Sequence, residues 1–159
     1  MWNGRLRRVS LAAIALFAVS CGGSVDLKQA VQVTDLTSGW YDAGIVDGKN
    51  KLVPSVTFKL RKPSNTNLST VSLNVVYRKA TGEDHDDVFV QRVDFTGDET
   101  APVTVRSQTG YTGDPPQSRA DMLKHSSFVD MDVEIFGRQS SSQWVSLHKA
   151  RITRQLLTN

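Results

Sequence analysis

The 159-residue sequence contains a single cysteine, Cys21, so no disulfide bond can form within one chain. Long apolar runs are also lacking, because only 12 residues separate Arg8 from Cys21, whereas a membrane-spanning helix needs about 20. The apolar stretch is therefore too short to be a membrane anchor in its own right. Stability must come from a hydrophobic core and backbone hydrogen bonds, which a chain of this size can supply.

An excess of one charge is absent once the first residues are set aside. The whole chain has 19 lysines and arginines against 16 acidic residues. Residues 1–20 contain three of the arginines and no acidic residue, so residues 21–159 hold 16 basic and 16 acidic side chains. Binding of nucleic acid through charge alone is therefore excluded for this part of the chain.

The first 24 residues have the organisation of an export signal. Arg5, Arg7 and Arg8 precede an almost wholly apolar stretch over residues 9–19, and small residues lead up to Cys21. The letters "AVSC" resemble a bacterial lipobox, in which the cysteine becomes the lipid-modified first residue of the mature chain. Ordinary secretory cleavage before Cys21 is the alternative, and it would leave a free thiol.

The lipobox resemblance implies a signal peptide over residues 1–20 and a lipidated tether over residues 21–28. Each acyl CH₂ buried in a bilayer contributes about 0.8 kcal/mol, so several chains on Cys21 would hold the protein at a membrane. Gly22 after the cysteine, under the sorting rule of such lipoproteins, indicates the outer membrane facing the periplasm. The expected location is therefore the cell envelope.

Apolar residues alternate with polar ones along most of residues 29–159, which is the pattern of half-buried strands. The alternation covers residues 30–36, 44–46, 53–62, 70–79, 88–95, 103–108, 128–137 and 144–153. Gly, Pro, Asn, Asp and Ser clusters separate these stretches as turns. The pattern predicts a mainly β fold, an antiparallel immunoglobulin-like β-sandwich of about seven strands with one short helix.

Residues 44–105 resemble the FxLYD type of extracytoplasmic β-sandwich domain. Gly44, Val46, Tyr77 and Gly82 stand at matching positions, in a Gly-x-Val strand, a long strand ending in Tyr, and the turn after it. This sequence departs from that pattern in having Asn74 for the Phe, and an arginine at residue 78 for the Asp. The resemblance implies a sandwich and no particular chemistry.

Residues 107–127 interrupt the strand pattern. Pro116 is a predicted first helical residue, and Met122 and Leu123 suit a helix of two or three turns that crosses between the sheets. Tyr111, Met122 and the stiff Pro115-Pro116 pair suit a recognition surface. The alternative is that Met122 and Leu123 cap an open end of the sandwich.

The stretch "GWYDAG" places Trp40 beside Tyr41. In a strand the two rings point to opposite faces, so one would enter the core and the other would be an exposed aromatic of the kind that interfaces favour. A loop in this position would instead let both rings pack. Trp40, Tyr41, Tyr111 and Met122 are the candidate binding residues.

Catalytic and metal-binding patterns are weak. Glu83, Asp84, Asp86 and Asp87 surround His85 in "GEDHDD", but the spacing of a calcium loop is missing, so a solvated turn and no metal is expected.

A Ser-x-x-Lys match at Ser146 and Lys149 falls in a predicted strand, where the two side chains would lie on opposite faces. The three histidines, His85, His125 and His148, are scattered. No enzymatic activity and no cofactor are expected.

The sequence thus predicts a lipid-anchored envelope protein that acts as a non-catalytic binding or scaffolding module, with an envelope protein as its partner. The alternative is a glycan- or lipid-binding module that uses its aromatic side chains. A cleft lined by Trp40, Tyr41 and Tyr111 would favour a ligand, and a flat patch would favour a protein.

Overall fold

The alternating stretches of the sequence form strands in the computed structural model, which describes residues 25–82 and 85–157. Two helices are short, α1 (Leu27–Ala30) and α2 (Arg119–Lys124). The strands are β1 (Gln32–Val46), β2 (Lys49–Arg61), β3 (Thr70–Lys79), β4 (His85–Thr96), β5 (Glu99–Thr100), β6 (Val103–Arg106), β7 (Tyr111–Gly113), β8 (Met131–Arg138), β9 (Val145–Arg151) and β10 (Leu156–Leu157). The predicted strands 30–36 and 44–46 are the two ends of β1.

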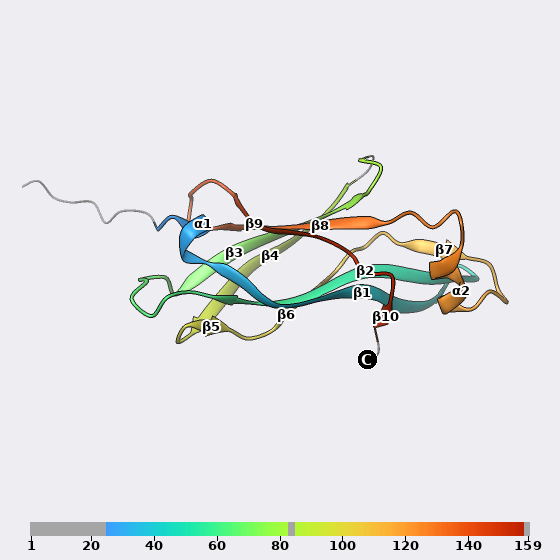
Figure 1. The fold of residues 1–159 in the computed structure, drawn as a ribbon, viewed down its shortest axis with the longest axis horizontal. Coiled ribbons are helices and arrows are strands. Elements are labelled where there is room, and N and C mark those ends of the chain that lie inside the picture. Colours follow the sequence, from blue (N-terminus) through green and yellow to red (C-terminus); the bar gives the residue numbers. More distant parts are fainter. Residues whose placement is uncertain (1–24, 83–84, 158–159) are drawn as a thin grey trace, which may run out of the picture.

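The strands belong to one curled sheet in the order β10-β1-β2-β5-β4-β3-β8-β9, with β6 and β7 also paired to β2. The sheet folds over on itself as a half-barrel: β1, β2, β6, β7 and β10 form the β2 half, and β3, β4, β8 and β9 form the β3 half (Figure 1). β5 connects them. β1 and β10 are parallel while the other pairs are antiparallel, so the mainly β prediction is confirmed and the strand directions are mixed.

The core lies between the two halves. Val56, Phe58 and Leu60 of β2 face Leu73 and other inward residues of β3, and all four are fully buried. Tyr77 on β3 is also fully buried, and its hydroxyl donates a 2.8 Å hydrogen bond to the Val105 carbonyl of the opposite half. Burial raises the pKa of the Tyr77 hydroxyl, because the charged form would lose its hydration.

Both ends of the described chain contribute to closing the half-barrel. Leu27 of α1 is 2% exposed, and the Val25 amide donates to Gln139 Oε1, so residues 25–28, part of the predicted tether, pack against the strands. The C-terminal segment crosses from β9 to β1, where the Trp40 amide donates to the Gln155 carbonyl at 2.8 Å. This segment covers the edge of β1 at Trp40 and Tyr41, and a covered edge is not available for pairing with another chain.

The stretch over residues 107–127 is less irregular than the sequence suggested. It contains β7, which pairs with Asn50, Lys51 and Leu52 of β2, and then α2. The helix begins at Arg119 and not at Pro116, because the Ser118 side chain caps it by accepting from the Asp121 amide. The stretch carries the chain from β7 in the β2 half to β8 in the β3 half.

Candidate functional site

The predicted aromatic pair lies in a strand, so its two rings separate. Trp40 of β1 is 2% exposed and packs in the core. Tyr41 lies on the outer side of β1, half-buried, with the Arg106 guanidinium 3.6 Å from the centre of its ring. The alternative of a loop in which both rings pack is not observed.

Trp40 forms an aromatic cluster at the α2 end of the molecule. Its ring meets the Phe128 ring edge-on with centroids 4.6 Å apart, and Tyr111 meets Phe128 at 5.0 Å. We call Trp40, Tyr111 and Phe128 the end cluster. Sequence reasoning missed Phe128, because it stands first in an alternating stretch and was assigned to a strand that actually begins at Met131.

A cleft of about 340 Å³ opens beside the end cluster. Apolar side chains of Trp40, Pro54, Tyr111, Val129 and Met131 form most of its walls, and the remaining lining residues are Lys79, Thr109, Gly110, Thr112 and Ser127. Ligand sites in proteins are typically concave, mostly apolar and bordered by a few polar groups. The structure therefore brings Trp40 and Tyr111 together at one cleft, and it places Tyr41 elsewhere.

One wall of the cleft is held close to β2. Gly110 lies so near the Leu52 carbonyl oxygen that a side chain at residue 110 would collide with it. Tyr111, the next residue, pairs with Leu52, and its hydroxyl lies 3.5 Å from His125 Nδ1. His125 also accepts from the Ser127 amide, so it links Tyr111 to the chain after α2.

Met122 does not belong to an accessible surface. It is fully buried and Leu123 is 6% exposed, with both in the core cluster. As a candidate binding residue, Met122 is therefore corrected to a core residue, and the capping interpretation of α2 accounts for both side chains. Helix side chains at successive positions can both be buried here because α2 closes the end of the half-barrel (Figure 1).

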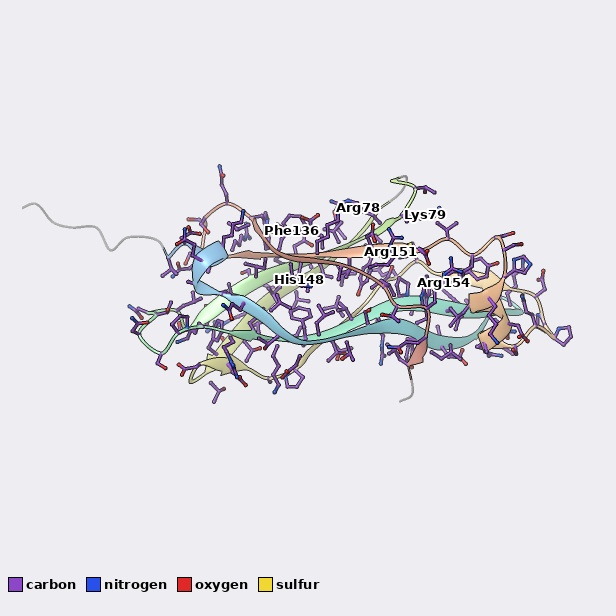
Figure 2. All side chains as sticks on the ribbon, in the orientation of Figure 1. Arg78, Lys79, Phe136, His148, Arg151 and Arg154 are labelled. Carbon is purple, nitrogen blue, oxygen red and sulfur yellow. The ribbon has the colours of Figure 1, made fainter. Side chains whose placement is uncertain are left out.

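Arg154 fastens this end of the molecule. Its guanidinium bonds Asp130 at 2.5 Å, lies 4.9 Å from the Phe128 ring centre, and donates to the Phe128 carbonyl at 3.3 Å and the Leu123 carbonyl at 3.4 Å. The hydrogen bond from Arg154 holds the pKa of the Asp130 carboxyl below its usual value. Figure 2 shows Arg154 on the C-terminal segment between β9 and β10, near the end that carries α2.

The other sequence candidates are dispersed. Cys21, Glu83 and Asp84 lie outside the described residues. Asp86 Oδ2 accepts from Ser107 Oγ at 2.6 Å and from the Gln108 amide at 2.8 Å, so this carboxylate ties β4 to the chain after β6. Over residues 25–82 and 85–157, no three metal-ligating side chains gather in a way that could hold an ion.

The prediction that Ser146 and Lys149 lie on opposite faces of a strand is wrong. The pairing of β9 with β8 shifts by one residue, so Ser146 lies opposite Phe136 and Lys149 lies opposite Glu134. An extra residue in a strand reverses which face later side chains occupy. Ser146 Oγ donates to Glu134 at 2.8 Å.

No known protein family matches this chain, and no curated protein sequence matches it. Among solved structures, it is similar to an X-ray structure of a target of the Northeast Structural Genomics Consortium. The two share 12% sequence identity over 79% of this chain and 88% of that chain, with a TM-score of 0.41. This likeness carries no inference about function.

In the part of the chain that the structure describes, every helix is too short or too polar to span a bilayer.

Proposed function

We propose that this protein is a lipid-anchored, non-catalytic binding module of the cell envelope, and that its cleft binds a small apolar group of a ligand or protein partner. The cleft beside the end cluster is the observation that carries the proposal. Five of its lining residues are apolar or aromatic, and its 340 Å³ falls within the range of small-molecule sites.

The position of the cleft suits an N-terminal anchor. Figure 1 shows α1 and α2 at opposite ends of the long axis. In the sequence, Cys21 comes four positions before Val25, the first described residue, and α1 begins at Leu27. A lipid on Cys21 would therefore hold the α1 end at the membrane and leave the cleft at the far end, where a partner can approach.

The anchor is tested by the mass and location of the exported protein. We expect intact-mass analysis to find acyl chains on Cys21 as the first residue, and Cys21→Ala to release the protein from membranes. Cys21→Ser is a second variant that lacks the thiol, and it should be released from membranes as well. A wild-type protein that is soluble with an unmodified cysteine contradicts the anchor.

The cleft is tested with N-phenyl-1-naphthylamine, a neutral dye that becomes fluorescent in apolar surroundings. We expect saturable binding by the full chain, with energy transfer from Trp40, which lines the cleft. Val129→Arg should weaken binding about tenfold or more, because it places a charge among the apolar walls.

Ile45→Arg is the matched control, since Ile45 is 65% exposed and does not line the cleft. Equal binding by wild type and both variants, or no saturable binding by wild type, contradicts the cleft as a binding site. Binding that only Val129→Arg weakens supports it.

The immunoglobulin-like relationship remains part of the proposal. It is supported by the two halves of the sheet facing each other across a core, as the sheets of a sandwich do. An envelope protein is the proposed partner. The alternative is a glycan or lipid ligand that is bound through exposed aromatic side chains.

A further inference from the structure

A second group of aromatic side chains lies on the outer side of the β3 half, facing away from the core. Asn74 at the middle of β3 pairs with Phe89 of β4 on one side and with Phe136 of β8 on the other. Trp144, just before β9, meets Phe89 edge-on with ring centroids 6.0 Å apart. We call Phe89, Asn74, Phe136 and Trp144 the outer aromatic face; Figure 2 labels Phe136 on β8.

Two hollows adjoin this face, one beside Trp144 and one beside Phe89. The smaller, of about 270 Å³, is lined by Asn74, Val76, Arg78, Asp87, Phe136 and Trp144. The larger, of about 750 Å³, is lined by Ser69, Thr70, Ser72, Phe89, Gln91, Arg92, Arg138 and Ser140. Each hollow has an aromatic ring beside side chains that carry hydrogen-bonding groups, and Phe89 is 52% exposed.

Arginines line both hollows, but they differ in whether an acidic side chain lies nearby. Arg78 is neutralised by Glu134 at 2.9 Å. Burial alone would raise the pKa of Glu134, but hydrogen bonds from Ser146 and Arg78 outweigh it and hold that pKa below its usual value. The larger hollow, in contrast, is lined by two arginines and by no acidic side chain.

Arg138 is the arginine of this surface that has no acidic partner in the described part of the chain. Its guanidinium lies 4.5 Å from the centre of the Trp144 ring, and its Nε is buried without a hydrogen-bond acceptor. Among the described residues no carboxylate pairs with Arg138, whereas Arg92 pairs with Asp94 at 3.0 Å. Asn74 Oδ1 is likewise buried without a donor. Arg138 lines the larger hollow and has no paired carboxylate among the described residues, so a carboxylate supplied by a ligand can form charge-assisted hydrogen bonds with its guanidinium.

We propose that the outer aromatic face binds an acidic oligosaccharide. A sugar ring has an apolar face of C–H groups, which packs on an aromatic ring, and an edge of hydroxyls, which suits Asn, Ser, Thr and Gln side chains. A uronic acid adds a carboxylate, which a guanidinium binds with two parallel hydrogen bonds. Trp144 and Phe89 provide the rings, and Arg138 provides the charge.

An acyl chain fits this surface less well. It would cover the polar lining of the larger hollow without forming hydrogen bonds to it, and burying such groups unpaired is unfavourable. The outer aromatic face shares no lining residue with the cleft beside the end cluster. The inference therefore stands or falls separately from the proposed function.

The experiment uses the emission of Trp144. The full chain, in detergent, carries Trp2→Phe and Trp40→Phe, so that Trp144 is its only tryptophan. The probes are a hexasaccharide of galacturonic acid and a hyaluronan hexasaccharide. The fully methyl-esterified galacturonate is the matched neutral ligand, because it keeps the rings and removes the charges.

We expect at least one acidic probe to shift Trp144 emission saturably, with weaker binding at higher salt. The esterified hexasaccharide should bind about tenfold more weakly, and Arg138→Gln should lose about tenfold in affinity for the acidic form. Phe89→Ala, at an exposed position, should weaken both forms. Arg106→Gln is the matched control, since Arg106 also stacks on an aromatic ring but lies in the β2 half. This variant should bind the acidic probe with the affinity of wild type.

Three results would overturn the proposal. The first is no saturable response to either acidic probe. The second is equal binding of the charged and esterified forms. The third is an Arg138→Gln variant that has the melting temperature of wild type and binds the acidic probe with unchanged affinity. A Trp144 response to anionic lipid vesicles but to neither saccharide would assign the face to a membrane surface instead.

Discussion

Trp40 and Trp144 lie on opposite sides of the same curled sheet and are held in contrasting ways. Trp40 is 2% exposed and packs against Phe128 at the end of the core. Trp144 is half-buried on the outer side of the β3 half, between Phe89 and the Arg138 guanidinium. One ring is surrounded by side chains that it helps to hold in place, and the other has neighbours on some of its sides only.

The difference teaches that an aromatic residue has two distinct uses in this fold. A ring inside the core contributes its whole buried surface to the free energy of unfolding. A ring outside the core contributes less to stability and keeps surface available to a ligand. The predictions below test this division from the largest expected effect to the smallest.

The largest contrast should come from truncating each tryptophan. Trp40→Ala is expected to lower the free energy of unfolding by about 3–5 kcal/mol, because it leaves a cavity in the core. Trp144→Ala should cost about 1 kcal/mol or less, since its ring packs on one edge contact and one cation. Urea unfolding of the two variants measures both values. Equal losses would show that the Trp144 ring contributes as much to the free energy of unfolding as the Trp40 ring.

The end cluster should also depend on the helix that covers it. Met122→Ala removes a fully buried side chain and is expected to lose about 2–5 kcal/mol. Lys124→Ala, an exposed position in the last turn of the same helix, is the control and should change stability little. A neutral result at Met122 would mean that α2 does not cap the core, and thermal unfolding followed by circular dichroism distinguishes the two.

Tyrosines on the inner and outer sides of the sheet allow a pH-dependent test, with a smaller expected change in the free energy of unfolding. The pKa of Tyr77 is raised by burial on the inner side, so the folded state keeps the proton at a pH where the unfolded chain loses it. Stability should therefore be full below about pH 10, the ordinary tyrosine value, and fall as the pH rises above it.

Tyr77→Phe should reduce that alkaline loss and cost about 1 kcal/mol at neutral pH, because the Val105 carbonyl loses its hydrogen bond. Tyr41→Phe is the control from the outer side of the sheet. Unfolding curves between pH 7 and about pH 11 measure the slope, and an identical slope in wild type and Tyr77→Phe contradicts the assignment.

The smallest effects are expected at the two stacked arginines. Arg106→Gln and Arg138→Gln each remove a cation from an aromatic ring on the outer side of the sheet, which is worth about 0.5–1 kcal/mol at exposed sites. Similar small losses in urea unfolding would show that neither arginine is needed for folding. A large loss at Arg138 alone would assign it a structural role.

Much of the strand pattern could be predicted because alternation is a local property. The inward positions of β2 and β3, including Phe58, Leu73 and Tyr77, are buried as their spacing requires. The alternation failed where the strand pairing is irregular, as at Ser146 and Lys149, because the shift between β8 and β9 depends on the partner strand. Alternation predicts that Trp40 and Tyr41 lie on opposite faces of a strand. That Trp40 is the inner ring, and that Tyr41 contacts Arg106 of a distant strand, depends on the tertiary structure.

The candidate sites were predictable only in part. Trp40 and Tyr111 were singled out as unusual aromatics, and they meet at the cleft. Phe128, which joins them, and Arg154, which fastens it, carry no local signal that separates them from ordinary strand or tail residues. The outer aromatic face has no local signal either, since Phe89 and Trp144 are 55 positions apart in the sequence.

The sequence by itself determined the mainly β composition of the domain, the inward faces of its central strands and the position of the irregular stretch. It did so because period-two alternation and turn residues act on neighbouring positions. Only the tertiary structure decided that the sheet curls into one half-barrel, that Met122 is a core residue, and that a cleft borders the end cluster and two hollows border the outer aromatic face. These features depend on contacts between distant parts of the chain, such as Ser38 with Thr153, whose formation follows from packing and not from local propensity.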